Sequence, residues 1–243
     1  MIEFIRQVLG VAYLQSIFVK RQPLWIVQGL ISAVGFTIII CVWGSVEALK
    51  NLVVAYIVAG AWGLGLNIVA QSIGWDRINR RLEYYVASPI TLPVYFIGTV
   101  LGCSPFMISS IVPALVAAIV FGVSPLPLLL LLPLSILALV LGAFFSLSIV
   151  LRLKNPTNIS AITNPLYTFT IVLPPVYYPL YALPLVLRPI ALLIPTVPLM
   201  EVARWITGYT ATACEPQLSL VLLVAWIIIT TLVVAKKFKW GLE

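Results

Sequence analysis

The sequence predicts an all-α integral membrane protein, built as one transmembrane domain over residues 1–243 with six membrane-spanning helices. Hydrophobic residues make up 62% of the chain and charged residues only 9%, whereas soluble domains average about 45–50% and about 25%. The mean hydropathy is +1.15. Apolar runs of about 20 residues, enough to cross about 30 Å of hydrocarbon, recur along the chain. The bilayer must therefore be the solvent for most of this surface.

Residues 1–22 are predicted to form a helix that lies in the membrane interface rather than crossing the bilayer. Polar positions recur at helical spacing along one side: Glu3, Arg6, Gln7, Gly10 and Tyr13. Apolar side chains fill the other side, which is typical of an interfacial amphipathic helix. A signal peptide is the alternative interpretation, but the apolar core is interrupted and no small-residue cleavage site follows the first span.

Six apolar runs follow, and we interpret each as a spanning helix: residues 24–44, 51–73, 93–121, 125–151, 159–178 and 218–235. Pro105 and Pro113 are expected to kink the third span. Gly60, Gly63 and Gly65 lie within the second span, where small residues indicate close helix packing.

The distribution of Lys and Arg predicts the orientation. With a cytoplasmic N-terminus, all but three of the 14 basic residues face inward: Arg6, Lys20, Arg21, Arg77, Arg80, Arg81, Arg152, Lys154, Lys236, Lys237 and Lys239. Lys50, Arg188 and Arg204 remain outside. The positive-inside rule then places both termini in the cytoplasm of a multi-pass plasma-membrane protein. The net charge of +7 follows from this orientation and from contact with anionic lipid, and requires no nucleic-acid partner.

The segment 179–215 is largely apolar but carries four helix-breaking prolines: Pro184, Pro189, Pro195 and Pro198. It cannot form one straight helix. We expect short re-entrant helices that dip into the outer leaflet and return, a backbone that is tolerated only against protein or a watery cavity. A hydrophobic loop on the outer membrane surface is the alternative.

The inner loop 74–92 carries the clearest functional signal. Ile78, Leu82 and Tyr85 recur at helical spacing, with arginines on another side, and this predicts a short amphipathic helix. Asp76 and Arg80 are spaced for an ion pair of about 0.3–0.5 kcal/mol, and Pro89 should end the helix by the preceding residue. The loop is interpreted either as a docking helix for a soluble partner or as an ordinary positive-inside loop.

The stretch RLEYYVASPI at residues 81–90 resembles the cytoplasmic signature of ABC-2 type transporter permeases, R-E-R-G-T-L-E-x-L-L-x-S-P-I. The matching positions are Arg77, Leu82, Glu83, Ser88, Pro89 and Ile90. Arg80 and Arg81 replace the Gly-Thr pair, which makes the docking face more basic than is usual in that family.

A second stretch is similar to the family's outer segment, F-P-x-x-x-L-P followed by N-P-L-x-x-x-x-x-R. The matching positions are Tyr178, Pro179, Leu183, Pro184, Pro198, Leu199 and Arg204, while Val197 replaces the usual Asn. Glu201 and Arg204 are spaced to pair on a helix. They could form a charged anchor at the outer interface or contact a substrate.

The resemblance implies the membrane subunit of an exporter that works by alternating access. Its partners would be two nucleotide-binding ATPase subunits, which hold ATP and Mg, and a second permease subunit that is identical or related. The implied ATPase-coupling residues are Asp76, Arg77, Arg80, Arg81, Glu83, Tyr84, Ser88 and Pro89, and the implied outer gate residues are Tyr178, Pro179, Pro184, Pro198, Glu201 and Arg204. The sequence has no G-x-x-x-x-G-K-[ST] phosphate loop, so hydrolysis is expected on another chain. We expect no cofactor and no enzymatic activity on this one.

Ionisable residues are scarce within the predicted spans, which argues against ion-coupled transport and against a cation channel. A large or amphiphilic cargo suits such a pathway. Candidate lining residues are Gln28, Ser32, Thr37, Asn67, Gln71 and Thr168. Hydrogen bonding between helices is the alternative role for each of them.

Two other functions remain as competing hypotheses. The chain could be an ATP-independent facilitator or scaffold. A membrane-embedded lipid enzyme would need clustered Asp, His or Cys, but the sequence has no histidine and its seven acidic residues are spread out. Cys41, Cys103 and Cys214 are scattered, form no metal-binding motif, and are expected to pack as small hydrophobic residues.

Overall fold

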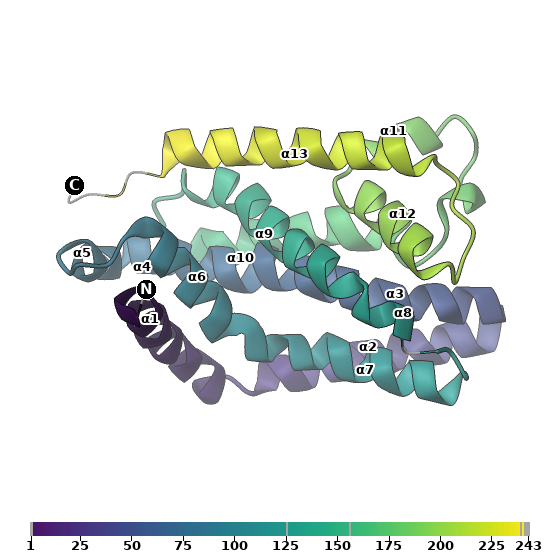
Figure 1. Cartoon of the computed structure of the whole chain (residues 1–243), viewed down its shortest axis with the longest axis horizontal. Coiled ribbons are helices and arrows are strands. Elements are labelled where there is room, and N and C mark those ends of the chain that lie inside the picture. The colour runs from purple at the N-terminus through teal and green to yellow at the C-terminus, as the bar shows by residue number, and fades with distance from the viewer. Residues whose placement is uncertain (1, 125, 156, 239, 241–243) are drawn as a thin grey trace.

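The structure is a computed structural model that describes residues 2–124, 126–155, 157–238 and 240, and this part of the chain contains helices, turns and irregular segments but no strand. Its helices run mainly along one long axis (Figure 1). The predicted all-helical membrane fold is therefore confirmed. Pro125, at the predicted start of the fourth span, and Lys239, assigned to the inner face, lie outside the described residues.

The first half of the chain forms nine helical elements, which are α1 (Ile2–Arg21), α2 (Leu24–Trp43), α3 (Val46–Gly63), η1 (Leu64–Val69), α4 (Ala70–Ile78), α5 (Arg81–Val86), α6 (Leu92–Cys103), η2 (Ser104–Met107) and α7 (Ile108–Val120). The second half forms α8 (Leu126–Leu129), α9 (Leu131–Val150), α10 (Thr157–Tyr167), η3 (Thr168–Val172), η4 (Leu180–Ala182), α11 (Arg188–Leu192), α12 (Thr196–Thr207) and α13 (Pro216–Lys237). The segments η1 and η3 are π-helical, and η2 and η4 are 3-10 helices.

Within the described residues, six helices are long and apolar enough to cross a membrane: Ile2–Arg21, Leu24–Val42, Val46–Ile78, Leu92–Val120, Leu131–Val150 and Pro216–Lys237. The predicted number agrees, but the set differs at two places. The N-terminal helix α1 qualifies by length and composition. The predicted fifth span does not, because its helical part ends at Val172, just before Pro174 and Pro175, and proline cannot continue a helix regularly.

The helix that runs through α3, η1 and α4 lies at the centre of the bundle. In its best spanning window 83% of the residues are buried within the chain, compared with 6% for α2. It begins at Ser45, whose hydroxyl accepts a hydrogen bond from the Ala48 backbone N–H at 3.2 Å, a standard N-terminal cap. The central helix contacts α7, α9 and α12. Because it is continuous from Val46 to Ile78, its side chains can reach both ends of the molecule.

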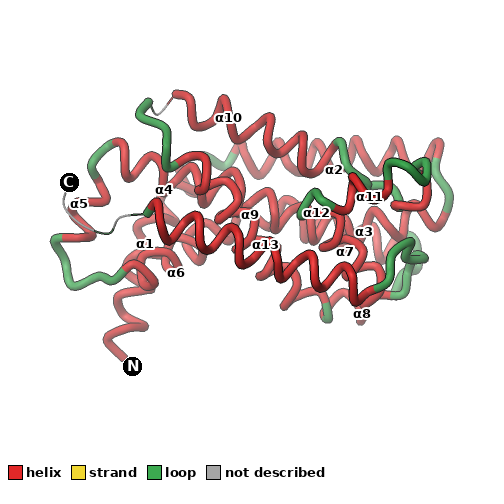
Figure 2. The backbone as a smooth tube through the Cα atoms, turned by 90° about the horizontal axis from the view of Figure 1, so that it is seen from above, coloured by secondary structure: helices red, strands yellow, loops and turns green. Residues whose placement is uncertain are grey.

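The two ends of the bundle collect different segments (Figures 1 and 2). One end holds α5, the start of α1 and the end of α13. The opposite end holds α8, α11 and the turn between α2 and α3. The helix α5, the start of α1 and the end of α13 therefore share one end of the bundle.

Helix α1 crosses α6 obliquely, while most other helices follow the long axis (Figure 1). Gly98 and Gly102 of α6 permit this close approach. A Cβ atom at Gly98 would lie 2.5 Å from the Val11 Cβ, and one at Gly102 would lie 2.6 Å from the Ala12 carbonyl oxygen. Small residues allow helix backbones to come this close, so α1 packs tightly against α6.

The predicted third span, 93–121, corresponds to α6, η2 and α7. Pro105 lies in the 3-10 segment that interrupts it, as the kink prediction required, and Pro113 lies inside α7. Prolines disrupt the regular α-helical hydrogen bonding.

The segment 179–215 folds into the short helices η4, α11 and α12. Nearly every residue of α12 is buried, against α3, α9 and α13. The helix ends at Gly208, whose φ of +64° lies in the left-handed region that glycine adopts without strain. The segment therefore packs an internal helix at the end opposite to α5.

Candidate functional site

The predicted docking helix is two short helices rather than one. Helix α4 ends at Ile78 and α5 begins at Arg81, with Arg80 between them at φ 60° and ψ 14°. Arg80 is the only non-glycine residue with a positive φ in the described part of the chain. It stands where the family signature has Gly, so the backbone keeps a conformation that glycine adopts most easily.

The expected coupling residues divide into an exposed and an internal group. Tyr84 is 79% exposed, and Arg80, Arg81 and Pro89 are also exposed. Glu83 is partly exposed and lies 3.9 Å from the Arg80 guanidinium. We name these five residues, Arg80, Arg81, Glu83, Tyr84 and Pro89, the basic docking face. Because charged groups here remain in water, the Arg80–Glu83 pair adds little stability.

Asp76 belongs to the internal group, and it does not form the expected pair with Arg80. Its Oδ2 atom accepts hydrogen bonds from Gln15 Nε2 at 3.0 Å and from the Tyr95 hydroxyl at 2.8 Å. Ser72 Oγ donates to Gln15 Oε1 at 3.0 Å. The pairing prediction was wrong because the chain turns at Arg80, and α4 directs Asp76 into the bundle. We name Gln15, Ser72, Asp76 and Tyr95 the inner cluster.

The other internal side chains tie the docking segment to the bundle. Arg77 Nη1 donates to the Leu151 carbonyl at the end of α9, and Ser88 Oγ donates to the Tyr85 carbonyl at 2.6 Å. The Tyr85 ring packs on the Tyr95 ring with centroids 4.8 Å apart. Burial raises the pKa of the Tyr85 hydroxyl, and the Asp76 carboxylate adds to the rise. Tyr85 therefore stays neutral and connects α5 to the inner cluster.

A cavity of about 540 Å³ opens between α2, the central helix, α7 and α10. Four of the expected pathway residues line it: Gln28, Ser32, Asn67 and Thr168. The other two do not. Thr37 forms a hydrogen bond with the Tyr56 hydroxyl at 2.8 Å, and Gln71 Nε2 donates one to Thr163 Oγ1 at 2.6 Å. These two residues therefore form hydrogen bonds between helices, which was the alternative role.

Both π-helical segments contribute to the cavity wall. Leu64, Asn67 and Ile68 come from η1, and Thr168 and Val172 come from η3. π-Helical turns occur often at functional sites. Towards the opposite end from the docking face, Phe36 and Tyr177 stack with centroids 4.8 Å apart, and both line the cavity.

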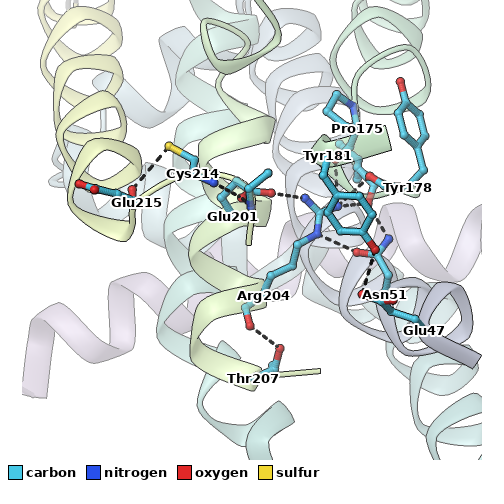
Figure 3. Close-up of polar contacts among 12 residues, drawn as sticks. Glu47, Asn51, Pro175, Tyr178, Tyr181, Glu201, Arg204, Thr207, Cys214 and Glu215 are labelled. Carbon is cyan, nitrogen blue, oxygen red and sulfur yellow. Dashed lines mark hydrogen bonds and ion pairs between the residues drawn. The ribbon is translucent and has the colours of Figure 1, made fainter. Parts of the chain in front are cut away.

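A buried ion pair organises the end of the bundle opposite to the docking face (Figure 3). Arg204 and Glu201 of α12 are 0% and 1% exposed, and Arg204 Nη1 lies 2.6 Å from Glu201 Oε1. Arg204 Nε donates to Asn51 Oδ1 of α3 at 2.8 Å. Its Nη2 atom donates to the carbonyls of Pro175, Val176 and Tyr178. The spacing prediction of a Glu201–Arg204 pair is thus confirmed.

The second oxygen of Glu201 holds the chain that leads into α13. Its Oε2 atom accepts hydrogen bonds from the backbone N–H groups of Ala213 at 2.8 Å and Cys214 at 3.2 Å. We name Asn51, Glu201 and Arg204 the outer cluster. Of the expected gate residues, Tyr178 joins it through its carbonyl, whereas Pro179 and Pro184 lie in the preceding loop and Pro198 is buried in α12.

Sequence reasoning missed Asn51, Gln15, Ser72 and Tyr95. The available signal was a polar side chain within an apolar run, because such a side chain needs a polar partner when it is buried. Sequence alone does not identify that partner, because Asn51 meets Arg204 across 153 positions.

Neither a disulfide nor a metal centre is formed by the described residues. No group of three or more His, Cys, Asp or Glu side chains is placed to hold a metal ion there. The cysteines are free: Cys103 is buried, Cys214 is partly buried and Cys41 is exposed. Cys103 therefore packs as a small hydrophobic residue, as expected, and Cys214 packs against an apolar cluster of Leu180, Ala191 and Val197, whereas Cys41 does not pack in the interior.

Comparison with known proteins identifies the family. The comparison with curated proteins gives no match. A family model described as ABC-2 type transporter matches residues 7–207, which include the docking face, the cavity and the outer cluster. The chain belongs to the ABC-2 type transporter family.

Proposed function

We propose that this chain is the membrane-spanning permease subunit of an ATP-powered exporter in the plasma membrane. Two separate ATPase subunits, which bind ATP and Mg, would dock on the basic docking face from the cytoplasm. A second permease subunit, identical or related, would complete the membrane domain. The observation that carries this proposal is the exposed docking face of a chain that belongs to the ABC-2 type transporter family.

The charge distribution supports a cytoplasmic position for the docking face. The helix α5, which begins at Arg81 directly after Arg80, lies at the same end as the start of α1 and the end of α13 (Figure 1), and Lys236 and Lys237 fall in the last turn of α13. Basic residues gather on the cytoplasmic side of membrane proteins. Arginine also pairs in bidentate fashion with carboxylates on a partner surface.

The inner cluster offers a route for coupling. Docking would move α5, and Tyr85 contacts Tyr95, which bonds Asp76. Asp76 in turn holds Gln15 of α1. A displacement of α5 would thus reach α1, α4 and α6 together. The oblique α1 (Figure 1) would lie in the inner interface as an amphipathic anchor against lipid.

The cavity would serve as this chain's share of the export pathway. Gln28 and Ser32 are exposed on α2 and Thr168 on η3, on surfaces that would otherwise meet lipid. Polar groups facing hydrocarbon are unfavourable, so these surfaces suit a hydrated path closed by the second permease subunit. The outer cluster would hold the re-entrant helix α12 as part of the outer gate.

A copurification experiment tests the proposal. The tagged chain is extracted from its native membranes with mild detergent, and its partners are identified by mass spectrometry. We expect an ATPase with a phosphate-binding loop to copurify with the wild-type chain. The double variant Arg80→Glu/Arg81→Glu should lose at least nine-tenths of that ATPase, because its acidic docking face would repel the partner's carboxylates.

The control is Lys50→Glu, a single charge reversal at the opposite end of the bundle, which should retain the ATPase. Equal recovery of the ATPase by the double variant would refute docking at this face. Transport by the reconstituted chain with no ATPase present would instead favour an ATP-independent facilitator.

A further inference from the structure

We infer that the cavity binds an uncharged, hydroxyl-rich amphiphile, such as a glycoside, and discriminates against ligands that carry a full charge. This inference deepens the proposed function by naming the substrate class of the same pathway. It is argued from the chemistry of the lining.

The lining is free of formal charge among the residues described. Besides three tyrosines, its polar members are amides and hydroxyls, namely Gln28, Ser32, Asn67, Ser109, Ser110, Asn164 and Thr168. The two charged clusters lie elsewhere, at the two ends of the bundle. A charged ligand entering this cavity would lose its hydration and find no opposite charge, which is costly in a medium of low dielectric constant.

Aromatic side chains supply the apolar part of the wall. They come from four elements and from the loop after η3: Trp25, Phe36, Tyr56, Phe106, Tyr167 and Tyr177. Flat rings pack against the apolar faces of a ligand, while neighbouring amides bond its polar edges. A sugar ring combines these two kinds of surface, because its C–H groups form faces and its hydroxyls form an edge.

Asn67 points to a ligand that donates a hydrogen bond. Its Oδ1 atom is buried and has no partner in the structure, although buried polar atoms almost always have one. Asn67 lies in the π-helical segment η1 and lines the cavity. A hydroxyl group both donates and accepts, so it satisfies Asn67 and the nearby amides and hydroxyls. An ammonium group only donates, and a sulfate only accepts.

The exposed rim and the buried floor together suit an amphiphile. Gln28 and Asn164 at the rim are exposed, whereas Tyr56, Ala59 and Leu64 at the floor are at most 4% exposed. An alkyl tail can remain against the apolar surfaces of α2, whose Ile31, Val34 and Ile38 are more than half exposed. A polar headgroup would then occupy the cavity.

The test uses the full chain in lipid nanodiscs without any ATPase, with empty nanodiscs as the blank. Three probes share one octyl chain and are used below their micelle-forming concentrations: octyl glucoside, octylammonium, whose charged group donates hydrogen bonds, and octyl sulfate, whose charged group accepts them. We expect the dissociation constant for octyl glucoside, measured by titration calorimetry, to be at least tenfold lower than that for either charged probe. Equal or tighter binding of a charged probe, or no binding of the glucoside above the blank, would overturn the inference.

Two variants then locate the site. Asn67→Leu should weaken octyl glucoside binding about tenfold, and Asn67→Asp should reverse the preference in favour of octylammonium. The control Asn158→Asp makes the same change at an exposed amide outside the lining and should leave all three affinities unchanged. Unchanged preference in Asn67→Asp would place the binding elsewhere and refute the assignment of this cavity. Because ATPase copurification is a separate measurement, failure of the ligand class leaves docking intact, and failure of docking leaves the ligand preference measurable.

Discussion

The inner cluster and the outer cluster both bury charge in the bundle, but they balance it differently. At the outer end, Arg204 meets Glu201 at 2.6 Å, and Asn51 and three backbone carbonyls complete its bonding. At the inner end, Asp76 is held by two neutral donors, Gln15 and Tyr95. Within the described residues, Asp76 takes part in no salt bridge, and the docking face lies next to it in sequence.

This difference indicates different tasks for the two ends. The outer cluster joins α3, α12 and the loops at either side of α12 through a charge pair that is stable only when complete. The inner cluster joins α1, α4 and α6 through neutral donors, whose rearrangement does not leave an unpaired cation. We therefore expect the outer cluster to be rigid and the inner cluster to be the part that moves when a partner docks.

The largest effect is expected from breaking the outer charge pair. Glu201→Gln would leave the buried Arg204 guanidinium without its counter-charge, and removing one partner of a buried pair costs about 3–5 kcal/mol. Thermal unfolding in detergent, followed by tryptophan fluorescence, measures the loss. The double variant Glu201→Gln/Arg204→Met should recover part of it, because no charge then remains buried. A single variant as stable as the wild type would mean that this pair is not the anchor of α12.

The same carboxylate-to-amide change at the inner end should have a much smaller effect. Asp76→Asn retains an oxygen that accepts from Gln15 and Tyr95, so we expect a loss of at most about 1.5 kcal/mol, the scale of one hydrogen bond. The same unfolding assay compares it directly with Glu201→Gln. If Asp76→Asn were the more destabilising change, the proposed contrast between the two ends would be wrong.

The smallest effect is expected at Arg80, in the turn between α4 and α5. Arg80 holds a left-handed conformation that costs about 1–2 kcal/mol for a residue with a Cβ, and glycine relieves this strain but is more flexible when unfolded. Arg80→Gly should therefore raise the free energy of unfolding by up to about 1 kcal/mol. Arg80→Val, whose branched side chain fits this region poorly, should lower it. A more stable Val variant would contradict the assigned backbone conformation.

Much of the fold could be predicted from the sequence, and the errors have identifiable physical causes. Span lengths follow from apolar runs, so five of the six predicted spans overlap helices that are long enough to cross a membrane. The run 159–178 was also expected to span, but its helical part ends at Val172, before two consecutive prolines. The Glu201–Arg204 pair was predictable because its residues lie one helical turn apart.

The candidate site was only partly predictable because its parts meet across long sequence separations. Gln28, Asn67 and Thr168 were expected in the pathway as polar residues within apolar runs, and the structure brings all three to one cavity. Asp76 was expected on the docking face, since local spacing paired it with Arg80. The helix α4 ends before Arg80, so the two residues share no helix face, and α4 directs Asp76 inward to partners 61 and 19 positions away.

The sequence by itself determined that the bilayer is the solvent and that the fold is helical, because apolar length acts locally along the chain, and the positions of Lys and Arg predict the orientation. Only the tertiary structure decided which buried charges are paired, which polar groups face the cavity, and which arginines remain exposed. Those outcomes depend on the packing of α1 on α6 and of α12 on α3. Such contacts join distant segments, and no local pattern of residues specifies them.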